Sequence, residues 1–254
     1  MIAITRDVSP SIAECELTHV ERTPIDWQRA VEQHEAYREL LASLGCEVVR
    51  LPADPAYPDC VFVEDTAIVL DGIAVITNPG AASRRGETEA VAAALAPYLP
   101  LARMPLGGGA TLDGGDVLVA DRTIYAGRSL RTNDAGIALL RELAAPHGYS
   151  VAAVDVTGCL HLKSAITRVS DTAMLVNRAW IDVAPFDGWQ MIDVDPSEPF
   201  GGNALKVGAA VIHPSAWTRT RARLESAGIE VVPVEADELA KAEGGVTCCS
   251  LLIA

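Results

Sequence analysis

Five stretches of this sequence share one pattern, in which polar residues or glycines precede a short apolar strand. They are VEDTAIVLDG from Val63, LDGGDVLVAD from Leu112, HLKSAITRVS from His161, GGNALKVGAAVI from Gly201 and GGVTCCSLLI from Gly244. Successive starts lie 49, 49, 40 and 43 residues apart. A period of this size, with one supersecondary unit in each repeat, is typical of a propeller or a solenoid. An ordinary α/β sheet gives the same alternation, so the pattern alone leaves both folds open.

Helices are predicted between these strands. Asp26 is expected to cap a helix from Trp27 to Leu44, which ends at Gly45 and is followed by a strand at 46–51. Three more helices are predicted at 86–98, 133–145 and 214–227, with extended segments such as 149–154 and 229–234 after them. The 254 residues, half of them hydrophobic, suffice for one large domain or two small ones.

The charge and the cysteines limit the partners and the compartment. A formal net charge of −14 argues against nucleic acid as a partner and favours a small cationic substrate. The six cysteines have no metal-binding spacing, and the N-terminus lacks a secretory signal, which together predict a reducing cytoplasm. The longest apolar run, 91–102, contains two prolines and is too short to span a membrane. A monomer and a homodimer both remain open.

The C-terminal stretch places two cysteines side by side. If Cys248 and Cys249 belong to a short strand, alternation turns one side chain toward the core and the other toward the space beside the glycines. Two buried, unreactive thiols are the simpler interpretation of this stretch by itself.

In a ring, the polar openings of all five strands can converge on one centre. Their residues would then supply a thiol, an imidazole and carboxylates, the parts of a nucleophile, its acid/base partner and an orienting group. Asp59, Glu64 and Asp65 lie in an apolar context, which implies internal arginine partners or a cationic ligand. Arg84 and Arg131 lie in predicted loops where a guanidinium can bind a carboxylate, although solvated loop arginines are common.

Seven motifs occur in the order found in a known family. DCVFVEDTA, NPGAASRR, LDGGDVL, GRSLRTN, HLKS, NALKVG and GGVTCCSLLI resemble the motifs of the dimethylarginine dimethylaminohydrolase family, within the guanidino-group-modifying superfamily. The resemblance implies one five-bladed α/β propeller domain, the pentein fold, over residues 1–254. It also implies hydrolysis of N-omega-methylated arginines to citrulline and an amine, through a covalent cysteine intermediate and without a metal or organic cofactor.

The resemblance further implies a catalytic triad of Cys248, His161 and Asp113. It assigns substrate binding to Leu17, Asp59, Phe62, Glu64, Asp65, Arg84, Arg131, Ala242 and Glu243. Glu243 stands where the family pattern leads us to expect Asp, so its longer side chain must reach the same group.

Three other functions and one metal site remain as alternatives. Arginine deiminases share the triad but are larger, and papain-like proteases carry the cysteine before the histidine, the reverse of the order here. A non-enzymatic propeller binding module is the third alternative, against which the complete triad argues. Cys248, His161 and Asp113 could hold an inhibitory zinc ion, although their scattered positions are weak support for a resident metal.

Overall fold

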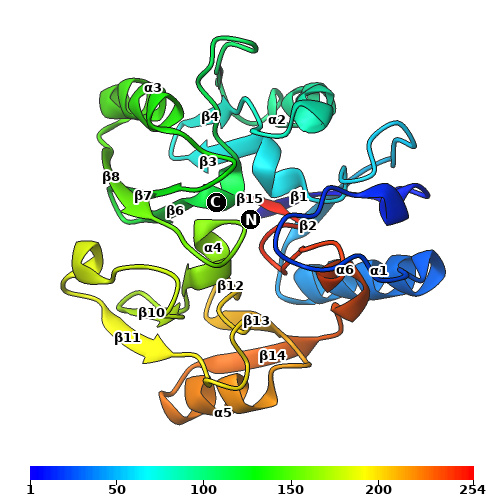
Figure 1. Cartoon of the computed structure of the whole chain (residues 1–254), viewed down its shortest axis with the longest axis vertical. Helices are drawn as coiled ribbons and strands as arrows, with labels where there is room; N and C mark the ends of the chain where they lie inside the picture. The colour runs from blue at the N-terminus through cyan, green and yellow to red at the C-terminus, as the bar shows by residue number, and fades with distance from the viewer.

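The computed structural model describes all 254 residues and contains five three-stranded sheets arranged around a central axis (Figure 1). Within each sheet, the middle strand pairs antiparallel with one neighbour and parallel with the other. A helical segment connects the two parallel strands of each sheet. The prediction of a five-bladed α/β propeller is therefore confirmed.

The elements are short, as expected for repeats of about 40 to 50 residues. The strands, sheet by sheet, are β15 (Leu251–Ile253), β1 (Ile2–Arg6) and β2 (Glu47–Leu51); β3 (Ala67–Leu70), β4 (Ile73–Ile76) and β5 (Leu101–Arg103); β6 (Val117–Ala120), β7 (Thr123–Arg128) and β8 (Ser150–Asp155); β9 (Ile166–Arg168), β10 (Ala173–Val176) and β11 (Gln190–Asp193); and β12 (Leu205–Val207), β13 (Ala210–Pro214) and β14 (Glu230–Val234). The α-helices are α1 (Trp27–Ser43), α2 (Thr88–Leu95), α3 (Asp134–Ala144), α4 (Leu162–Ala165), α5 (Thr218–Ser226) and α6 (Asp237–Ala240). The 3-10 helices are η1 (Ile12–Glu14), η2 (Val63–Thr66), η3 (Ala82–Glu87), η4 (Gly114–Asp116), η5 (Ala145–His147) and η6 (Ala184–Phe186).

The two ends of the chain form one sheet. β15 pairs antiparallel with β1, with Ile253 opposite Ile2, and β1 pairs parallel with β2. Figure 1 shows both termini near the centre of the ring. The fifth blade is thus built from the first and last strands, so backbone hydrogen bonds close the ring and fix its two ends together.

The predicted helices occur, with one boundary clearly displaced. Asp26 caps α1 by accepting a hydrogen bond from the Arg29 N–H at 3.1 Å, and Gly45 follows the helix with a positive φ of 88°. The helix predicted from position 214 begins only at Thr218. Pro214 instead ends β13, where it pairs with Val234. That boundary was wrong because the apolar strand extends further than the prediction allowed.

The two adjacent cysteines do not belong to a strand. β15 begins at Leu251, and Cys248 and Cys249 lie in the turn before it. The predicted difference in their directions holds for another reason, the geometry of this turn. Cys249 is buried in an apolar cluster with Tyr37 and Leu41, whereas Cys248 is half-buried at the mouth of the turn.

The helices are too short or too polar to cross a bilayer. The longest, α1, has 17 residues, and no helix combines the length and apolar content that a crossing requires.

Candidate active site

The openings of the five blades meet at the axis of the ring, as predicted. Backbone and side-chain hydrogen bonds link neighbouring openings: the Glu64 N–H donates to the Cys248 carbonyl, and the Gly115 N–H donates to Asp65. Asn203 donates to the Lys163 carbonyl and accepts from the Thr247 N–H. Residues from five distant segments therefore form one polar centre.

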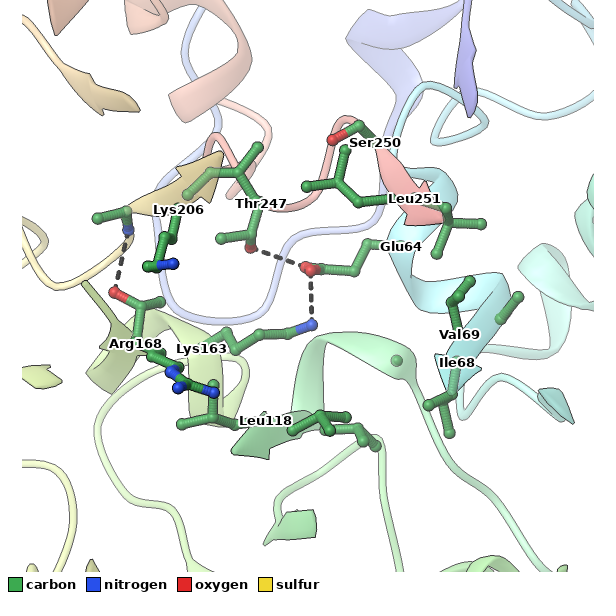
Figure 2. Close-up of a pocket in the computed structure, with 18 of the residues that line it drawn as sticks. Glu64, Ile68, Val69, Leu118, Lys163, Arg168, Lys206, Thr247, Ser250 and Leu251 are labelled. Carbon is green, nitrogen blue, oxygen red and sulfur yellow. Dashed lines mark hydrogen bonds and ion pairs between the residues drawn. The ribbon is translucent and has the colours of Figure 1, made fainter. Parts of the chain in front are cut away.

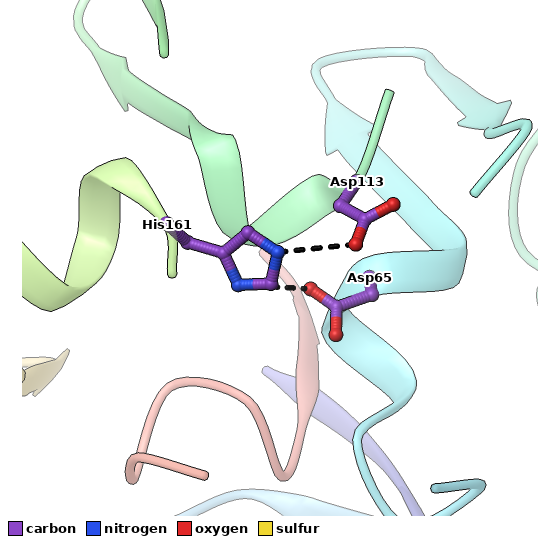
Figure 3. Close-up of side chains that lie close together, drawn as sticks. All are labelled: Asp65, Asp113 and His161. Atoms are coloured by element: carbon purple, nitrogen blue, oxygen red, sulfur yellow. Dashed lines mark hydrogen bonds and ion pairs between the residues drawn. The ribbon is translucent and has the colours of Figure 1, made fainter. Parts of the chain in front are cut away.

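His161 is held by a carboxylate on one ring nitrogen. Its Nε2 lies 3.1 Å from Oδ2 of Asp113, which has no exposed surface (Figure 3). The other oxygen of Asp113 accepts a hydrogen bond from the Gly80 N–H at 2.8 Å. Both oxygens of Asp113 are therefore occupied, which fixes the orientation of the imidazole plane.

A second carboxylate faces the other ring nitrogen. Oδ1 of Asp65 lies 3.8 Å from Nδ1 of His161 (Figure 3). Gly115 permits this approach, because a Cβ at that position would lie 2.5 Å from Nδ1 and 2.7 Å from Asp65 Oδ1. Gly115, the second glycine of the LDGGD motif, is therefore required because the imidazole lies close to the backbone at this position.

Atoms of Asp65, Asp113 and His161 lie within 4.8 Å of one another, a spacing that a metal ion could bridge. Both carboxylates already have other partners, however. Asp65 accepts from the Gly115 N–H and forms an ion pair with Arg84, and Asp113 accepts from the Gly80 N–H. This cluster is accordingly organised by the hydrogen bond between His161 and Asp113, the ion pair between His161 and Asp65, and the other partners of the two carboxylates.

Cys248 lines the same cavity as His161. Its sulfur accepts a hydrogen bond from the Gly245 N–H at 3.3 Å. Burial raises the pKa of the Cys248 thiol to about 12, and the negative charges of Glu64 and Asp65 add to the rise. Without a bound cation the Cys248 thiol is therefore protonated at neutral pH.

The pKa of His161 is raised, whereas that of an ordinary buried histidine is lowered. Burial by itself would lower its pKa, but the charges of Asp65 and Asp116 and the hydrogen bond to Asp113 raise the pKa of His161 to about 9. The imidazole is thus positively charged at neutral pH and can donate a proton from either nitrogen.

Asp65 has an internal arginine partner. Oδ2 of Asp65 lies 2.5 Å from Nη1 of Arg84, and both side chains are buried. Nε and Nη2 of Arg84 bind Glu87, and Nη2 also donates to the Phe62 carbonyl. Of the two partners that the sequence left open for Asp65, an internal arginine or a cationic ligand, the structure shows the arginine, and Arg84 has one Nη1 N–H left for the cavity.

Glu64 points away from the cavity that contains Cys248. It forms an ion pair with Lys163 at 2.5 Å and accepts a hydrogen bond from the Thr247 hydroxyl at 2.8 Å (Figure 2). These residues line a second cavity of about 440 Å³, with apolar walls that include Ile68 and Leu118. The adjacent residues Glu64 and Asp65 therefore serve different cavities.

The other residues predicted to bind the substrate lie in or beside the cavity that contains Cys248. Asp59, Phe62, Arg84, Arg131, Ala242 and Glu243 line the cavity together with Asp65, His161 and Cys248. Asp113 lies behind His161. Leu17 is half-buried against the core beside this cavity, and its neighbour Glu16 supplies the lining instead.

The segment around Leu17 covers the cavity. The carboxylate of Glu243 accepts hydrogen bonds from the backbone N–H groups of Thr18 and His19, at 2.7 and 2.5 Å. Asp59 accepts from the Glu16 N–H at 3.1 Å. The free volume left beneath is only about 10 Å³, too little for an amino acid, so this segment must move when a substrate enters.

Comparison with known proteins decides the family. The family model described as N,N dimethylarginine dimethylhydrolase, eukaryotic, matches residues 20–253. The dimethylarginine dimethylaminohydrolase of Streptomyces coelicolor is 41% identical over 98% of this chain and 95% of its own length. The enzyme from Pseudomonas aeruginosa is 32% identical over 89% of each chain. The chain belongs to the dimethylarginine dimethylaminohydrolase family. It is therefore an amidine hydrolase.

Solved structures agree with this membership. A structure of the Pseudomonas aeruginosa family member complexed with citrulline matches with a TM-score of 0.92 and 31% identity, over 98% of this chain and 97% of that one. The N-terminal domain of a cyanobacterial arginine dihydrolase matches with a TM-score of 0.86 but 18% identity, and shares the fold alone. Both likenesses confirm the pentein propeller.

Sequence reasoning missed several residues of this dimethylarginine dimethylaminohydrolase-family site. Glu16 and Leu160 line the cavity although neither belongs to a distinctive motif. Gly244 lies against Phe62, where a Cβ would come within 2.2 Å of the ring. The repeated GG in three of the five openings was the available signal for such close approaches.

Proposed function

We propose that this protein hydrolyses N-omega-methylated arginines, asymmetric dimethylarginine and monomethylarginine, to citrulline and dimethylamine or methylamine. The observation that carries the proposal is the charged His161 held between Asp113 and Asp65 in the cavity that contains the Cys248 thiol. A cationic acid beside a thiol suits the displacement of an amine from a guanidinium.

Asp59 and Asp65 are the proposed ligands of the substrate guanidinium. Both carboxylates line the cavity, where charge-assisted hydrogen bonds would turn the guanidinium carbon toward the sulfur. Burial raises the pKa of Asp59 against the opposing charge of Arg84, which makes its charge costly in the empty site. A bound cation would relieve that cost.

The opposite end of the substrate is assigned to Arg131, with Ala242, Glu243 and Leu17 near the amino group. Arg131 lines the cavity and is only 8% exposed, and its guanidinium has no closer acidic partner than Asp113 at 3.7 Å. Arg84 is committed to Asp65 and Glu87, so we assign it at most one contact with the substrate carboxylate. Phe62 forms an apolar wall.

Substrate binding also activates the nucleophile. The entering guanidinium counteracts the negative charges that keep the Cys248 thiol protonated, so the thiol pKa falls and its proton leaves to solvent. The thiolate attacks the guanidinium carbon and forms a neutral tetrahedral adduct. His161 then donates its proton to the methylated nitrogen, and the carbon–nitrogen bond breaks to release the amine and leave a thiouronium cation on the sulfur.

Hydrolysis of this intermediate restores the enzyme. The now neutral His161 accepts a proton from a water molecule, and the resulting hydroxide attacks the thiouronium carbon. The carbon–sulfur bond breaks, Cys248 leaves as thiolate, and the hydroxyl proton passes to this thiolate, which gives the urea group of citrulline and restores the thiol. Each proton transfer by His161 is worth about 10²–10⁴-fold in rate. No step requires a metal or an organic cofactor.

We also propose that residues 1–254 act as one catalytic unit in a reducing compartment such as the cytoplasm. Residues from several blades line the cavity, and all six cysteines are free thiols, two of them at positions 248 and 249. A nucleophilic thiol with a free neighbour benefits from surroundings that keep both reduced.

One assay tests the reaction and its intermediate. Purified protein is incubated separately with asymmetric dimethylarginine, monomethylarginine and arginine, and citrulline is measured. We expect citrulline from the methylated substrates, and an acid-quenched adduct on Cys248 by mass spectrometry. Citrulline from arginine alone would identify a deiminase. No citrulline from any of the three substrates would leave the non-enzymatic binding module as the remaining alternative.

A further inference from the structure

Asp116 is a fully buried carboxylate that the proposed reaction does not use directly. It is the last residue of η4, three positions after Asp113, and none of its surface is exposed. A buried carboxylate is costly unless its oxygens are bound, so its partners indicate its purpose.

One oxygen of Asp116 holds the backbone next to His161. Oδ1 accepts a hydrogen bond of 2.9 Å from the N–H of Leu162, the first residue of α4. His161 caps this helix without a side-chain hydrogen bond of its own, so Asp116 supplies the missing acceptor. The contact is tight, because a Cβ on Gly127 would lie 2.6 Å from the same oxygen.

The other oxygen reaches the loop that carries Arg131. Oδ2 accepts a hydrogen bond of 2.6 Å from the Ser129 hydroxyl. The Ser129 oxygen in turn accepts from the backbone N–H groups of Arg131 and Thr132, at 3.0 and 3.2 Å. Asp116 thereby fixes, through one serine, the turn that aims Arg131.

A third branch leads to Asp113. It runs through Thr132, whose N–H donates to the Ser129 oxygen at 3.2 Å and whose hydroxyl oxygen accepts from the Asp113 N–H at 3.1 Å. One carboxylate is thus connected to the backbones that carry His161, Arg131 and Asp113, which come from three separate segments.

We propose that Asp116 is the positioning residue of the active site, which aligns His161, Asp113 and Arg131 with one another through the hydrogen bonds of its two oxygens. The proposal rests on the proposed roles of those three residues. The charge of Asp116 is energetically expensive: burial raises the pKa of Asp116 to about 6, with the charge of His161 opposing the rise. Several charged groups act on His161, namely Asp65 from η2, Asp113 and Asp116 around η4, Arg84 from η3 through Asp65, and Arg131 beside Asp113.

Asparagine at this position cannot preserve the network. The Leu162 N–H could still bind the amide oxygen, but the amide NH₂ would face the Ser129 hydroxyl, whose oxygen already accepts from two backbone groups. Asp116→Asn should therefore release the Arg131 turn and remove a negative charge from His161 at the same time.

The test measures the pKa of His161 by NMR titration of its ring, together with citrulline kinetics and the unfolding midpoint. Asp116→Asn should lower the pKa of His161 by about 1–3 units and kcat/KM by about 10²-fold or more. Glu198→Gln is the matched control, since Glu198 is also a buried acid that accepts from helix N–H groups, those of Arg219 and Thr220 in a different blade. It should lower the unfolding midpoint and leave the pKa of His161 unchanged.

Ser129→Ala separates the two effects and serves if Asp116→Asn does not fold. It should raise KM for methylarginine by about tenfold, with a smaller fall in the pKa of His161 than in Asp116→Asn, because the Asp116 carboxylate and its bond to the Leu162 N–H remain while the Arg131 turn is released. An unchanged pKa of His161 in folded Asp116→Asn, or an unchanged KM in Ser129→Ala, overturns the proposal. The NMR titration needs no turnover, so a wild-type protein without citrulline activity would refute the proposed reaction while the charge effect is still measured.

Discussion

The carboxylate of Glu243 accepts a hydrogen bond of 2.7 Å from the backbone N–H of Thr18, across 225 positions of the sequence. It also binds the N–H of His19, and Glu243 itself has a φ of +57°, which is uncommon for a residue other than glycine. A residue with this backbone conformation and two charge-assisted bonds to a covering segment indicates that Glu243 holds this segment in place over the cavity.

Glu243→Gln should loosen the covering segment. Because bonds to a charged acceptor contribute about 1.5–3 kcal/mol, hydrogen exchange at the amides of Thr18 and His19 should accelerate by about tenfold to a hundredfold. Hydrogen-exchange mass spectrometry over residues 16–25 measures the change. Glu21→Gln, an exposed acid in the same segment, is the control and should leave the exchange as it is.

Exchange of sulfur for oxygen should distinguish the two adjacent cysteines. Cys248→Ser should reduce citrulline formation by more than about 10³-fold, because it removes the proposed nucleophile. Cys249→Ser should keep most of the activity, since its thiol faces the core and donates to the Gly245 carbonyl. Equal losses in two variants with native circular dichroism would mean that the nucleophile is wrongly assigned.

Alkylation of the Cys248 thiol should have an unusual pH dependence in the enzyme without substrate. Its pKa of about 12 lies well above that of an ordinary cysteine, near 8.5, so the thiolate fraction should rise about tenfold per pH unit up to pH 10. Iodoacetamide labelling of Cys248, followed by mass spectrometry, gives the rate at each pH. A plateau of the rate near pH 8 to 9 would contradict the raised pKa.

Asp65→Asn should affect both folding and turnover, because Asp65 faces His161 and also pairs with Arg84. Loss of one partner of a buried ion pair costs about 3–5 kcal/mol, measured as the free energy of unfolding in urea. Glu87→Gln disturbs Arg84 from its other side and provides the comparison. It should destabilise the fold, while the pH dependence of citrulline formation stays that of the wild type.

Local patterns in the sequence predicted much of the propeller. The Asp26 cap, the Gly45 helix end and the five polar openings each depend on neighbouring residues, and the structure contains all of them. The pairing of β1 with β15 depends on closure of the ring, which no local pattern encodes. The proposed triad was predicted from the motif resemblance and not from local patterns.

Local sequence patterns could not predict which residues pair with the acidic side chains. Glu64 and Asp65 are adjacent and chemically alike, yet the 3-10 turn η2 directs one toward Lys163 and the other toward His161. The sequence placed both Arg84 and Arg131 in loops, but the structure places Arg84 in η3, where Glu87 and Asp65 occupy most of its N–H groups. Side-chain pairing across blades is a property of the closed ring, so residue type alone could not predict it.

Arg131 provides the sharpest test of how the substrate is oriented. Its turn is fixed by Ser129, its guanidinium lines the cavity, and Gly80 packs against its backbone, where a Cβ would lie 2.4 Å from the carbonyl oxygen. A bidentate guanidinium would bind the substrate carboxylate and hold the reacting carbon near the sulfur.

Arg131→Lys should therefore impair both kcat and KM. Lysine keeps the charge but lacks the planar fork, so we expect a loss of one to two orders of magnitude in kcat/KM, or about 1.4–2.8 kcal/mol. A methylated guanidine on a plain alkyl amine lacks the carboxylate and is the control substrate. The wild type should prefer methylarginine over this analogue, and Arg131→Ala should erase the preference by slowing only the methylarginine reaction. If the variant discriminates as strongly as the wild type, Arg131 does not bind the carboxylate, and the substrate lies in the cavity in another orientation.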